Sequence, residues 1–466
     1  MLPDRTRPFS RYFGDKAFYI LVLSILIPII IQNAITNFVN LLDNVMVGQI
    51  GTEQMSGVAI VNQLMFVFNL CVFGAISGAG IFSAQFYGAK DLEGVRSCFR
   101  YKIIVGAILV SAAAVVFTLF GRQLISSYLN DADAPEQLAV TMHHALQYLR
   151  IMLWGLLPFA LTQIYAGTLR DCGKTRLPMT AGIVAVFVNL VFNWLLIFDH
   201  FGFKGMGVRG AALATVISRY VELGIVTVFT HTKSDQYPFS KGLYRTLRIP
   251  GELIRGITVK GMPLLVNEAL WSIGMAKLTQ SYSLRGLSVV AALNISSTIS
   301  NLFAVAFLSM GSATAIIIGQ TLGANELKEA REKARQLIVF SLLISLGSGL
   351  LLLALSGLIP HVYNTEASVR HLASRLLQVY ALCMPIFSFA NSTYFILRSG
   401  GKTGLTFIFD SGFTWVICVP LAMLLIHYTT LETVTVYLIV QLSDIIKCAM
   451  GYSMLRKGIW VNNMVR

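Results

Sequence analysis

The chain has 466 residues, of which 55% are hydrophobic and only 12% are charged, and its formal net charge is +14. Soluble domains carry about 25% charged residues, so this composition excludes a soluble enzyme as well as a disordered or fibrous chain. A bilayer core of about 30 Å needs about 20 apolar residues per helix, so the chain has the length for about twelve spans and for no separate soluble domain. The composition therefore predicts an all-α polytopic membrane protein.

Twelve apolar runs follow one another along the chain, joined by short loops. They lie at 17–47, 57–87, 101–121, 143–168, 177–199, 210–231, 254–282, 287–321, 336–360, 372–397, 404–428 and 431–455. The first run is too long for a signal peptide and has no small-residue cleavage signature, so we expect it to remain as the first span. Each of the other runs is predicted to form one further transmembrane helix.

The Lys and Arg residues are concentrated on one side of these spans. The N-terminal segment, every second loop and the C-terminal tail carry 27 of them, including Lys90, Lys174, Lys328 and Lys447, whereas the opposite loops carry 5. Because basic residues collect in cytoplasmic loops, this bias predicts a plasma-membrane protein with an even number of spans and both termini in the cytoplasm. Topology thus accounts for the positive charge, and we expect no nucleic-acid partner.

The sequence contains an internal repeat. Segment 85–96 recurs at 320–331, where Gln, Gly, Ala, Leu and Arg coincide at a constant offset of 235. A Leu-Arg-x-x-Gly-Lys-Thr motif at 169–175 likewise recurs at 397–403. Both copies of each motif fall on the basic side, so the two halves insert with the same orientation. We expect them to be related by a pseudo-two-fold axis along the membrane normal.

The repeat also predicts where the chain divides. The longest loop contains Pro238 and Pro250 among alternating basic and apolar residues, which is typical of an interfacial linker. We expect an N-terminal six-helix bundle at 1–232, a cytoplasmic linker at 233–253 and a C-terminal six-helix bundle at 254–466. A role of the linker in lipid binding or regulation is an alternative to a purely connecting role.

Acidic residues inside spans are the best functional candidates, because a charge at the membrane centre costs at least about 2.5–3.5 kcal/mol. Asp43 lies in the first run, beyond Pro28, and a helical stripe leads to it, formed by Asn33, Asn37, Asn40 and Asn44. A polar stripe that ends in a carboxylate should face a cavity rather than lipid, which predicts an ion or proton site. A helix cap near the membrane interface is the alternative for Asp43.

Further polar candidates lie in the fifth, seventh and eleventh runs. Asn189 and Asn193 are one helical turn apart, so they either contribute to the cavity or hold helices together. Glu268 and Asp410 are each a candidate for a second protonation site. Either acid could instead pair with a buried base, for instance Glu268 with Lys277.

Other patterns point to structure rather than to chemistry. Glu222 follows Arg219 by three residues, and Lys447 follows Asp444 by three, so both spacings predict structural ion pairs. The six cysteines and seven histidines show no metal-ligand spacing. The chain also lacks H-E-x-x-H and G-x-S-x-G motifs. We therefore expect no enzyme activity, no cofactor and no metal centre, except that Na⁺ could bind at Asp43.

Several of these motifs resemble the multidrug and toxic compound extrusion (MATE) family over essentially the whole chain. The resemblance is carried by Pro28 and the Asn40-Leu-Leu-Asp43 segment that follows it, and by segments 85–89, 169–175, 189–193 and 207–215. It implies an ion-coupled antiporter of two six-helix bundles, in which Asp43 is the coupling carboxylate and Pro28 bends the first helix. It also makes Asn189 a polar partner in the same cavity.

The chain departs from the family pattern at one of these positions. Asn193 stands where some members have an aspartate, which removes one carboxylate from the N-terminal half. Glu268 matches an acid found in one branch of the family and leaves open a second coupling site in the C-terminal half.

Together these features predict a multidrug efflux antiporter that exports amphipathic organic cations in exchange for H⁺ or Na⁺ by alternating access. The residues expected to bind the coupling ion are Asp43, Asn40, Asn189 and Asn193, with Glu268 and Asp410 as a possible second site. The span interiors contain three candidate acids, Asp43, Glu268 and Asp410, and few buried bases, which favours small lipophilic cations as substrates. Membrane lipids are the other expected partners, and we expect a monomer. The alternative function is a flippase for lipid-linked precursors, which would need a more basic cavity.

Overall fold

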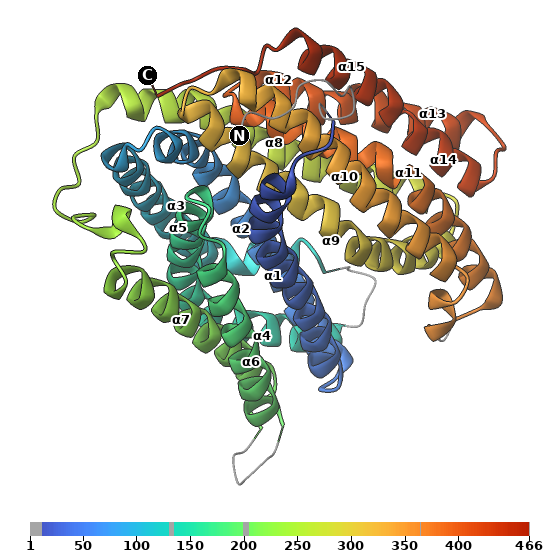
Figure 1. Ribbon diagram of the computed structural model, residues 1–466. Coiled ribbons are helices and arrows are strands. Elements are labelled where there is room, and N and C mark those ends of the chain that lie inside the picture. The colour runs from blue at the N-terminus through green and yellow to red at the C-terminus, as the bar shows by residue number, and fades with distance from the viewer. Residues whose placement is uncertain (1–11, 130–134, 199–204, 364, 466) are drawn as a thin grey trace. The chain divides into compact units, whose positions relative to one another are not determined.

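The computed structural model describes residues 12–129, 135–198, 205–363 and 365–465, without the side chains of 39–45, 52 and 287. Within these ranges the chain is almost entirely helical (Figure 1). The helices are α1 (Lys16–Gly48), α2 (Thr52–Gly88), α3 (Leu92–Ser126), α4 (Pro135–Met152), α5 (Leu156–Asp171), α6 (Arg176–Ile197), α7 (Val208–Thr232), α8 (Gly251–Ser283), α9 (Leu287–Gly323), α10 (Leu327–Leu355), α11 (Ala367–Ser399), α12 (Thr403–Phe407), α13 (Val419–Tyr428), α14 (Thr433–Leu442) and α15 (Asp444–Lys457).

Eleven helical stretches in the described part of the chain are long and apolar enough to cross a membrane. Among them, α4 with α5, α12 with α13, and α14 with α15 each form one stretch. The remaining predicted run, 254–282, corresponds to α8, which is 33 residues long but carries several charged side chains. The all-α polytopic fold predicted from composition and run lengths is confirmed.

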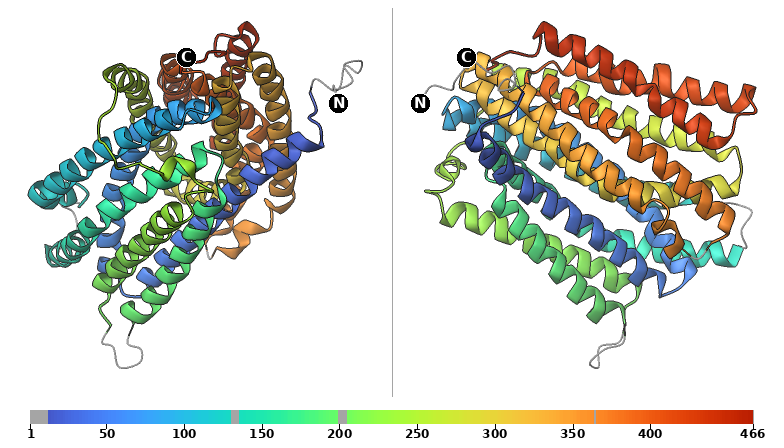
Figure 2. Two further views of the ribbon diagram at one scale, coloured as in Figure 1. Left: turned by 60° about the vertical axis from the view of Figure 1, so that its left-hand side comes forward. Right: turned by 45° about the vertical axis from the view of Figure 1, so that its right-hand side comes forward.

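Packing contacts divide the chain into two compact units. The N-terminal unit consists of Ile31–Ser83 and Asp91–Thr258, and the C-terminal unit consists of the chain up to Ile30, Ala84–Lys90 and Val259–Arg466. In the N-terminal unit α6 packs along α7, and in the C-terminal unit α9, α10 and α11 lie side by side (Figure 2). The predicted division into bundles at 1–232 and 254–466 remains a prediction.

The repeated segments share their backbone conformation. Lys90 and Asn325, which are 235 positions apart, have φ values of 61° and 62° and are the non-glycine residues with positive φ in the described part of the chain. Gly173 and Gly401, the matching glycines of the second motif, both have φ of 72°. Glycine adopts this left-handed conformation without steric penalty and commonly ends helices in this way. The repeat is therefore structural as well as sequential.

The repeat also brings its two copies into contact within the C-terminal unit. Gly88, at the end of α2, lies against the backbone of Gln320 in α9, and Gly323 lies against the backbone of Gln85 in the same way. A Cβ atom at either glycine would overlap the facing carbonyl group. Small residues permit this close approach of membrane helices. The contact is reciprocal, so the two copies are related by a local two-fold arrangement.

This crossing predicts an effect of single methyl groups. Gly88→Ala and Gly323→Ala are each expected to destabilise the protein by about 1–3 kcal/mol. The added Cβ atom would overlap a backbone carbonyl group, which cannot move aside as a flexible side chain can. Gly167→Ala in α5 is the matched control, since a Cβ there meets no atom within 4 Å. Melting temperatures in detergent measure all three effects. Equal effects at the three positions would contradict the interpretation of the crossing.

Candidate functional site

In the N-terminal unit, the two asparagines predicted to share a face of α6 are buried and hydrogen-bonded. Asn193 Nδ2 donates to Asn189 Oδ1 at 3.1 Å, and Asn189 Nδ2 lies 3.5 Å from Thr215 Oγ1 on α7. Asn193 is 2% exposed and Asn189 is 5% exposed. They form a polar patch between α6 and α7, and their participation in ion binding remains a prediction.

Helix α1 carries the acid predicted to bind the coupling ion. It continues without a break through Pro28 and ends at Gly48. The side chains of Asp43 and Asn40, like that of Asn44, lie outside the described residues, so their roles and the bend at Pro28 remain predictions.

A polar cluster that sequence analysis did not single out lies one turn beyond Pro28. Gln32 Oε1 accepts a hydrogen bond of 2.9 Å from Arg170 Nη2 of α5. A Cβ atom at Gly182 of α6 would lie 3.3 Å from Gln32 Nε2 and 3.7 Å from Glu222 Oε1. Side chains of α1, α5 and α7 therefore gather beside α6, at a position where glycine leaves them room.

This arrangement corrects one predicted ion pair. Arg219, which lies one turn before Glu222 on α7, donates instead to the carbonyl of Gly155 at 3.2 Å. Its guanidinium group also lies 5.0 Å from the ring centre of Phe159. The three-residue spacing allowed the Arg219–Glu222 pair, but a free carbonyl and an aromatic face on the neighbouring segment bind the guanidinium group.

In the C-terminal unit, Asn267 of α8 is the centre of a buried hydrogen-bond network. Its Nδ2 atom donates to Asp410 Oδ2 at 3.1 Å and lies 3.5 Å from the hydroxyl group of Tyr394 on α11. Its Oδ1 atom accepts a hydrogen bond of 3.2 Å from the backbone N–H of Ser411, whose Oγ atom lies 2.8 Å away. Asn267 is 1% exposed. Both ends of the amide are engaged, which fixes its orientation.

Glu268 joins this network through Tyr394, whose hydroxyl group donates to Glu268 Oε1 at 3.3 Å. Lys277, which the sequence offered as an alternative partner of Glu268, donates instead to Gln280 Oε1 at 3.0 Å. The two acids predicted as possible second coupling residues, Glu268 and Asp410, therefore lie in one network, although they come from different helices.

Asp410 forms a nearly buried ion pair, which the sequence left open as an alternative without indicating the partner. Lys447 Nζ on α15 donates to Asp410 Oδ1 at 2.8 Å, and the two side chains are 12% and 19% exposed. The ammonium group also lies 5.3 and 6.0 Å from the ring centres of Phe409 and Phe413. Lys447 was predicted to be a tail residue paired with Asp444. It is instead an interior residue that compensates the charge of Asp410.

The backbone beside Asp410 departs from the α-helical form. Two π-helical turns, Ile408–Gly412 and Thr414–Cys418, join α12 to α13. Such turns are rare and frequently occur at functional sites. Here the first of them contains both Asp410 and Ser411, and both of these adjacent residues contact Asn267.

Sequence analysis missed several members of this network. Asn267 directly precedes Glu268 in an apolar run, so the rule that polar residues inside spans are candidates could have found it. The same rule applied to run 431–455 would have placed Lys447 inside the membrane. Tyr394 and Ser411 carry no such signal, because tyrosine and serine are common in membrane helices for other reasons.

An all-α protein with acids and amides joined inside its membrane helices has the features of a secondary transporter. The sequence profile of the MatE family matches residues 28–195 and 263–424. The chain therefore belongs to the MATE family of multidrug efflux transporters, whose members are transporters and not enzymes. The family predicted from the sequence motifs is confirmed.

Curated relatives match along most of their length. The chain is 26% identical over 415 residues to the probable multidrug resistance protein YoeA of Bacillus subtilis, and the aligned region covers 88% of each chain. It is 23% identical over 409 residues to the probable multidrug resistance protein NorM of Thermotoga maritima, and the aligned region covers 87% of this chain and 85% of that protein.

Solved structures share the fold. A MATE protein in complex with MaL6 matches with a TM-score of 0.84 at 20% identity, covering 97% of this chain and 98% of that one. The outward-facing conformation of a multidrug resistance MATE family transporter matches with a TM-score of 0.83 at 20% identity, covering 98% and 99%. These matches support the helical architecture over the full described chain.

Proposed function

We propose that the protein is an antiporter that exports amphipathic, lipophilic organic cations in exchange for H⁺ or Na⁺. The observation that supports this most directly is the acid–amide network of Glu268, Tyr394, Asn267 and Asp410, because ionisable groups inside membrane helices mark ion pathways. The curated relatives are named probable multidrug resistance proteins, which supports export of several compounds.

The first coupling site in this proposal is Asp43 with Asn40, Asn189 and Asn193. Its support is the polar stripe of the first helix and the resemblance to the family, together with the buried amide pair on α6. Amide oxygens can bind Na⁺, and amide N–H groups can hold a carboxylate in place while it exchanges a proton. No cofactor enters this scheme.

Glu268 is the second coupling residue in this proposal, and Asp410 is not. The ammonium group of Lys447 already compensates the charge of Asp410. Glu268, by contrast, accepts a hydrogen bond from the neutral hydroxyl group of Tyr394, and the charge of the buried Arg398 also acts on it. A carboxylate in such a setting can take up H⁺ or Na⁺. Asp43 and Glu268 then remain as the acids that favour cationic substrates.

The wider arrangement follows from the same reasoning. We place both termini on the cytoplasmic side of the plasma membrane, because the basic loops lie on that side of the predicted spans. Alternating access would move the bundles at 1–232 and 254–466 relative to each other about the linker at 233–253. The proposal treats the protein as a monomer.

Transport in proteoliposomes tests the proposal. A fluorescent organic cation should move only when a pH or Na⁺ gradient is imposed, and imposing the two gradients separately identifies the coupling ion. A second lipophilic cation should compete, whereas an anion of similar size should not. Preference for the anion, or transport indifferent to both gradients, would contradict the proposal. Flipping of a labelled lipid-linked precursor without cation transport would favour a flippase instead.

Glu268→Gln separates coupling from structure. Glutamine can still accept the hydrogen bond from Tyr394, so the melting temperature should change little. The response of transport to one of the two imposed gradients should be lost. Glu252→Gln, at an exposed position near the start of the same helix, is the matched control and should transport normally. A Glu268→Gln protein that keeps the wild-type response to both gradients would exclude Glu268 from coupling.

A further inference from the structure

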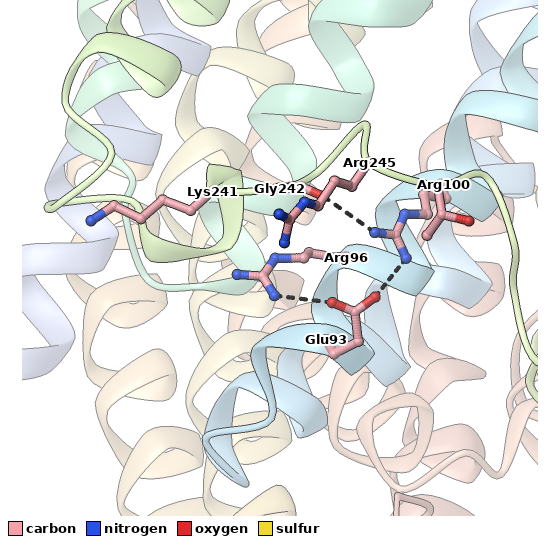
Figure 3. A pocket seen from close by; sticks show the side chains of 7 residues that line it. Glu93, Arg96, Arg100, Lys241, Gly242 and Arg245 are labelled. Carbon is pink, nitrogen blue, oxygen red and sulfur yellow. Dashed lines mark hydrogen bonds and ion pairs between the residues drawn. The ribbon is translucent and has the colours of Figure 1, made fainter.

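A basic pocket of about 400 Å³ lies beside the linker in the N-terminal unit (Figure 3). We call it the linker pocket. Its lining residues come from the first turns of α3 and from the linker, and they are Glu93, Arg96, Arg100, Lys241, Gly242, Arg245 and Thr246. Four of these side chains are cationic and one is anionic, so the lining carries a net positive charge.

Two arginines of the linker pocket are held in place by the backbone of the linker. The Nε atoms of Arg96 and Arg100 donate to the carbonyls of Phe239 and Leu243 at 3.2 and 3.0 Å. Their Nη1 atoms donate to opposite oxygens of Glu93 at 3.0 and 2.6 Å (Figure 3). Arg100 is 3% exposed. One carboxylate therefore holds two guanidinium groups side by side.

These contacts leave donors for a ligand. A guanidinium group has five N–H donors. The Nη2 atoms of Arg96 and Arg100 lie 3.3 and 3.4 Å from further linker carbonyls, so each group has three contacts with the protein in all. Two N–H donors of each arginine remain, in positions that are already fixed. Planar, fixed guanidinium groups match the geometry of phosphate oxygens.

Arg245 and Lys241 are the other cations of the lining, and Figure 3 shows the ammonium group of Lys241 pointing away from Arg96 and Arg100. The guanidinium group of Arg245 extends toward that of Arg96 in Figure 3. Lys241 pairs with Asp235 at 2.6 Å, but the side chains are 57% and 92% exposed, so this pair is weak and easily exchanged. Glu93 offsets the charge of one arginine only. The remaining positive charges repel one another, and a bound anion would relieve this repulsion.

The linker pocket lies where membrane helices end. Helix α3 begins at Leu92, and α7 ends at Thr232, just before the linker. On the linker, Tyr244 and Leu247 are 56% and 62% exposed. Tyr244 is nevertheless anchored, because its hydroxyl group is hydrogen-bonded to that of Tyr165 on α5. Exposed aromatic and apolar side chains at helix ends are typical of the membrane interface. An anion that reaches the pocket from this interface would be a lipid headgroup.

We propose that the linker pocket binds the phosphate group of an anionic membrane phospholipid. Arg96, Arg100 and Arg245 donate to the phosphate oxygens, and the acyl chains lie toward the exposed apolar side chains of the linker. The bound headgroup would join α3 to the linker in addition to the existing carbonyl contacts. A free phosphate ion shares this chemistry but has no acyl chain, and an experiment can distinguish the two.

Native mass spectrometry of the full chain in detergent, titrated with phosphatidylglycerol, tests the proposal. We expect a saturable site whose affinity falls about fivefold in Arg245→Gln, because one Lys or Arg near a membrane surface contributes about that factor. Arg248→Gln is the matched control, since it removes the same charge from an exposed linker position outside the pocket and should leave the affinity unchanged. Phosphatidylcholine with the same acyl chains should bind more weakly.

Lys241→Gln is a second variant that should lower the affinity in the same direction. Melting temperatures without lipid should match the wild type for both variants, because neither residue holds the linker to α3. Unchanged affinity in both variants would overturn the proposal. An equal loss in Arg248→Gln would do the same, because it would indicate diffuse surface charge. Displacement of phosphatidylglycerol by millimolar inorganic phosphate would overturn the assignment to a lipid.

Discussion

Asp43→Asn should reduce coupled transport to the level of empty liposomes while the protein stays folded. Asparagine keeps the size of aspartate and much of its hydrogen bonding, but it can neither take up a proton nor neutralise Na⁺. The exchange cycle would then lose its ion-binding step in the N-terminal half. Dye transport under imposed pH and Na⁺ gradients, compared with the melting temperature in detergent, measures both parts of this expectation.

A matched control separates the loss of coupling from a general effect of removing an acid. Asp235→Asn removes a carboxylate from the exposed linker, where it pairs with the exposed Lys241. This variant should transport at the wild-type rate. A well-folded Asp43→Asn protein that exports the dye normally would remove Asp43 from the mechanism and leave Glu268 as the candidate coupling residue.

Breaking the Asp410–Lys447 pair should have the largest effect on stability. Asp410→Asn or Lys447→Met leaves one charge without its partner in a nearly buried position, which typically costs about 3–5 kcal/mol. The double variant removes both charges and should be more stable than either single variant. Thermal unfolding in detergent, read as a double-mutant cycle, measures the coupling between the two residues.

The exposed pair of Arg375 and Glu432 is the control for this cycle. Its side chains are 43% and 70% exposed, so breaking it should cost less than about 1 kcal/mol. If the two double-mutant cycles gave equally small coupling free energies, the charge of Asp410 would be tolerated without Lys447. That result would make Asp410 a coupling candidate again.

The fold was largely predictable because its signals are local. Spans follow from the length of apolar runs, and the recurring Leu-Arg-x-x-Gly-Lys-Thr motif indicated that Gly173 and Gly401 are equivalent positions, where both have positive φ. Asn189 and Asn193 were correctly predicted to share a face, since a spacing of four residues alone determines this. These predictions needed no knowledge of how one helix packs against another.

The network around Asn267 was not predictable in the same way. Its members belong to α8, α11 and the π-helical segment after α12, and a π-helical turn changes which face a residue occupies relative to an α-helix. The spacing of Asp444 and Lys447 showed that they could meet. It could not show that Asp410, from another part of the chain, would bind the lysine instead. Contacts of this kind depend on the rotation and packing of whole helices.

The reciprocal contact of Gly88 with Gln320 and of Gly323 with Gln85 has a consequence for how the two halves of the sequence can diverge. Elsewhere in the chain, the side chains around a substituted residue can rearrange to accommodate it, and these side chains differ between the two halves. At this crossing each copy is the surface against which the other fits, backbone on backbone, so no side-chain change in one copy can make room for a larger residue in the other. Glycine is therefore required at both Gly88 and Gly323. Mutual fit therefore gives a physical reason why segments 85–96 and 320–331 still resemble each other.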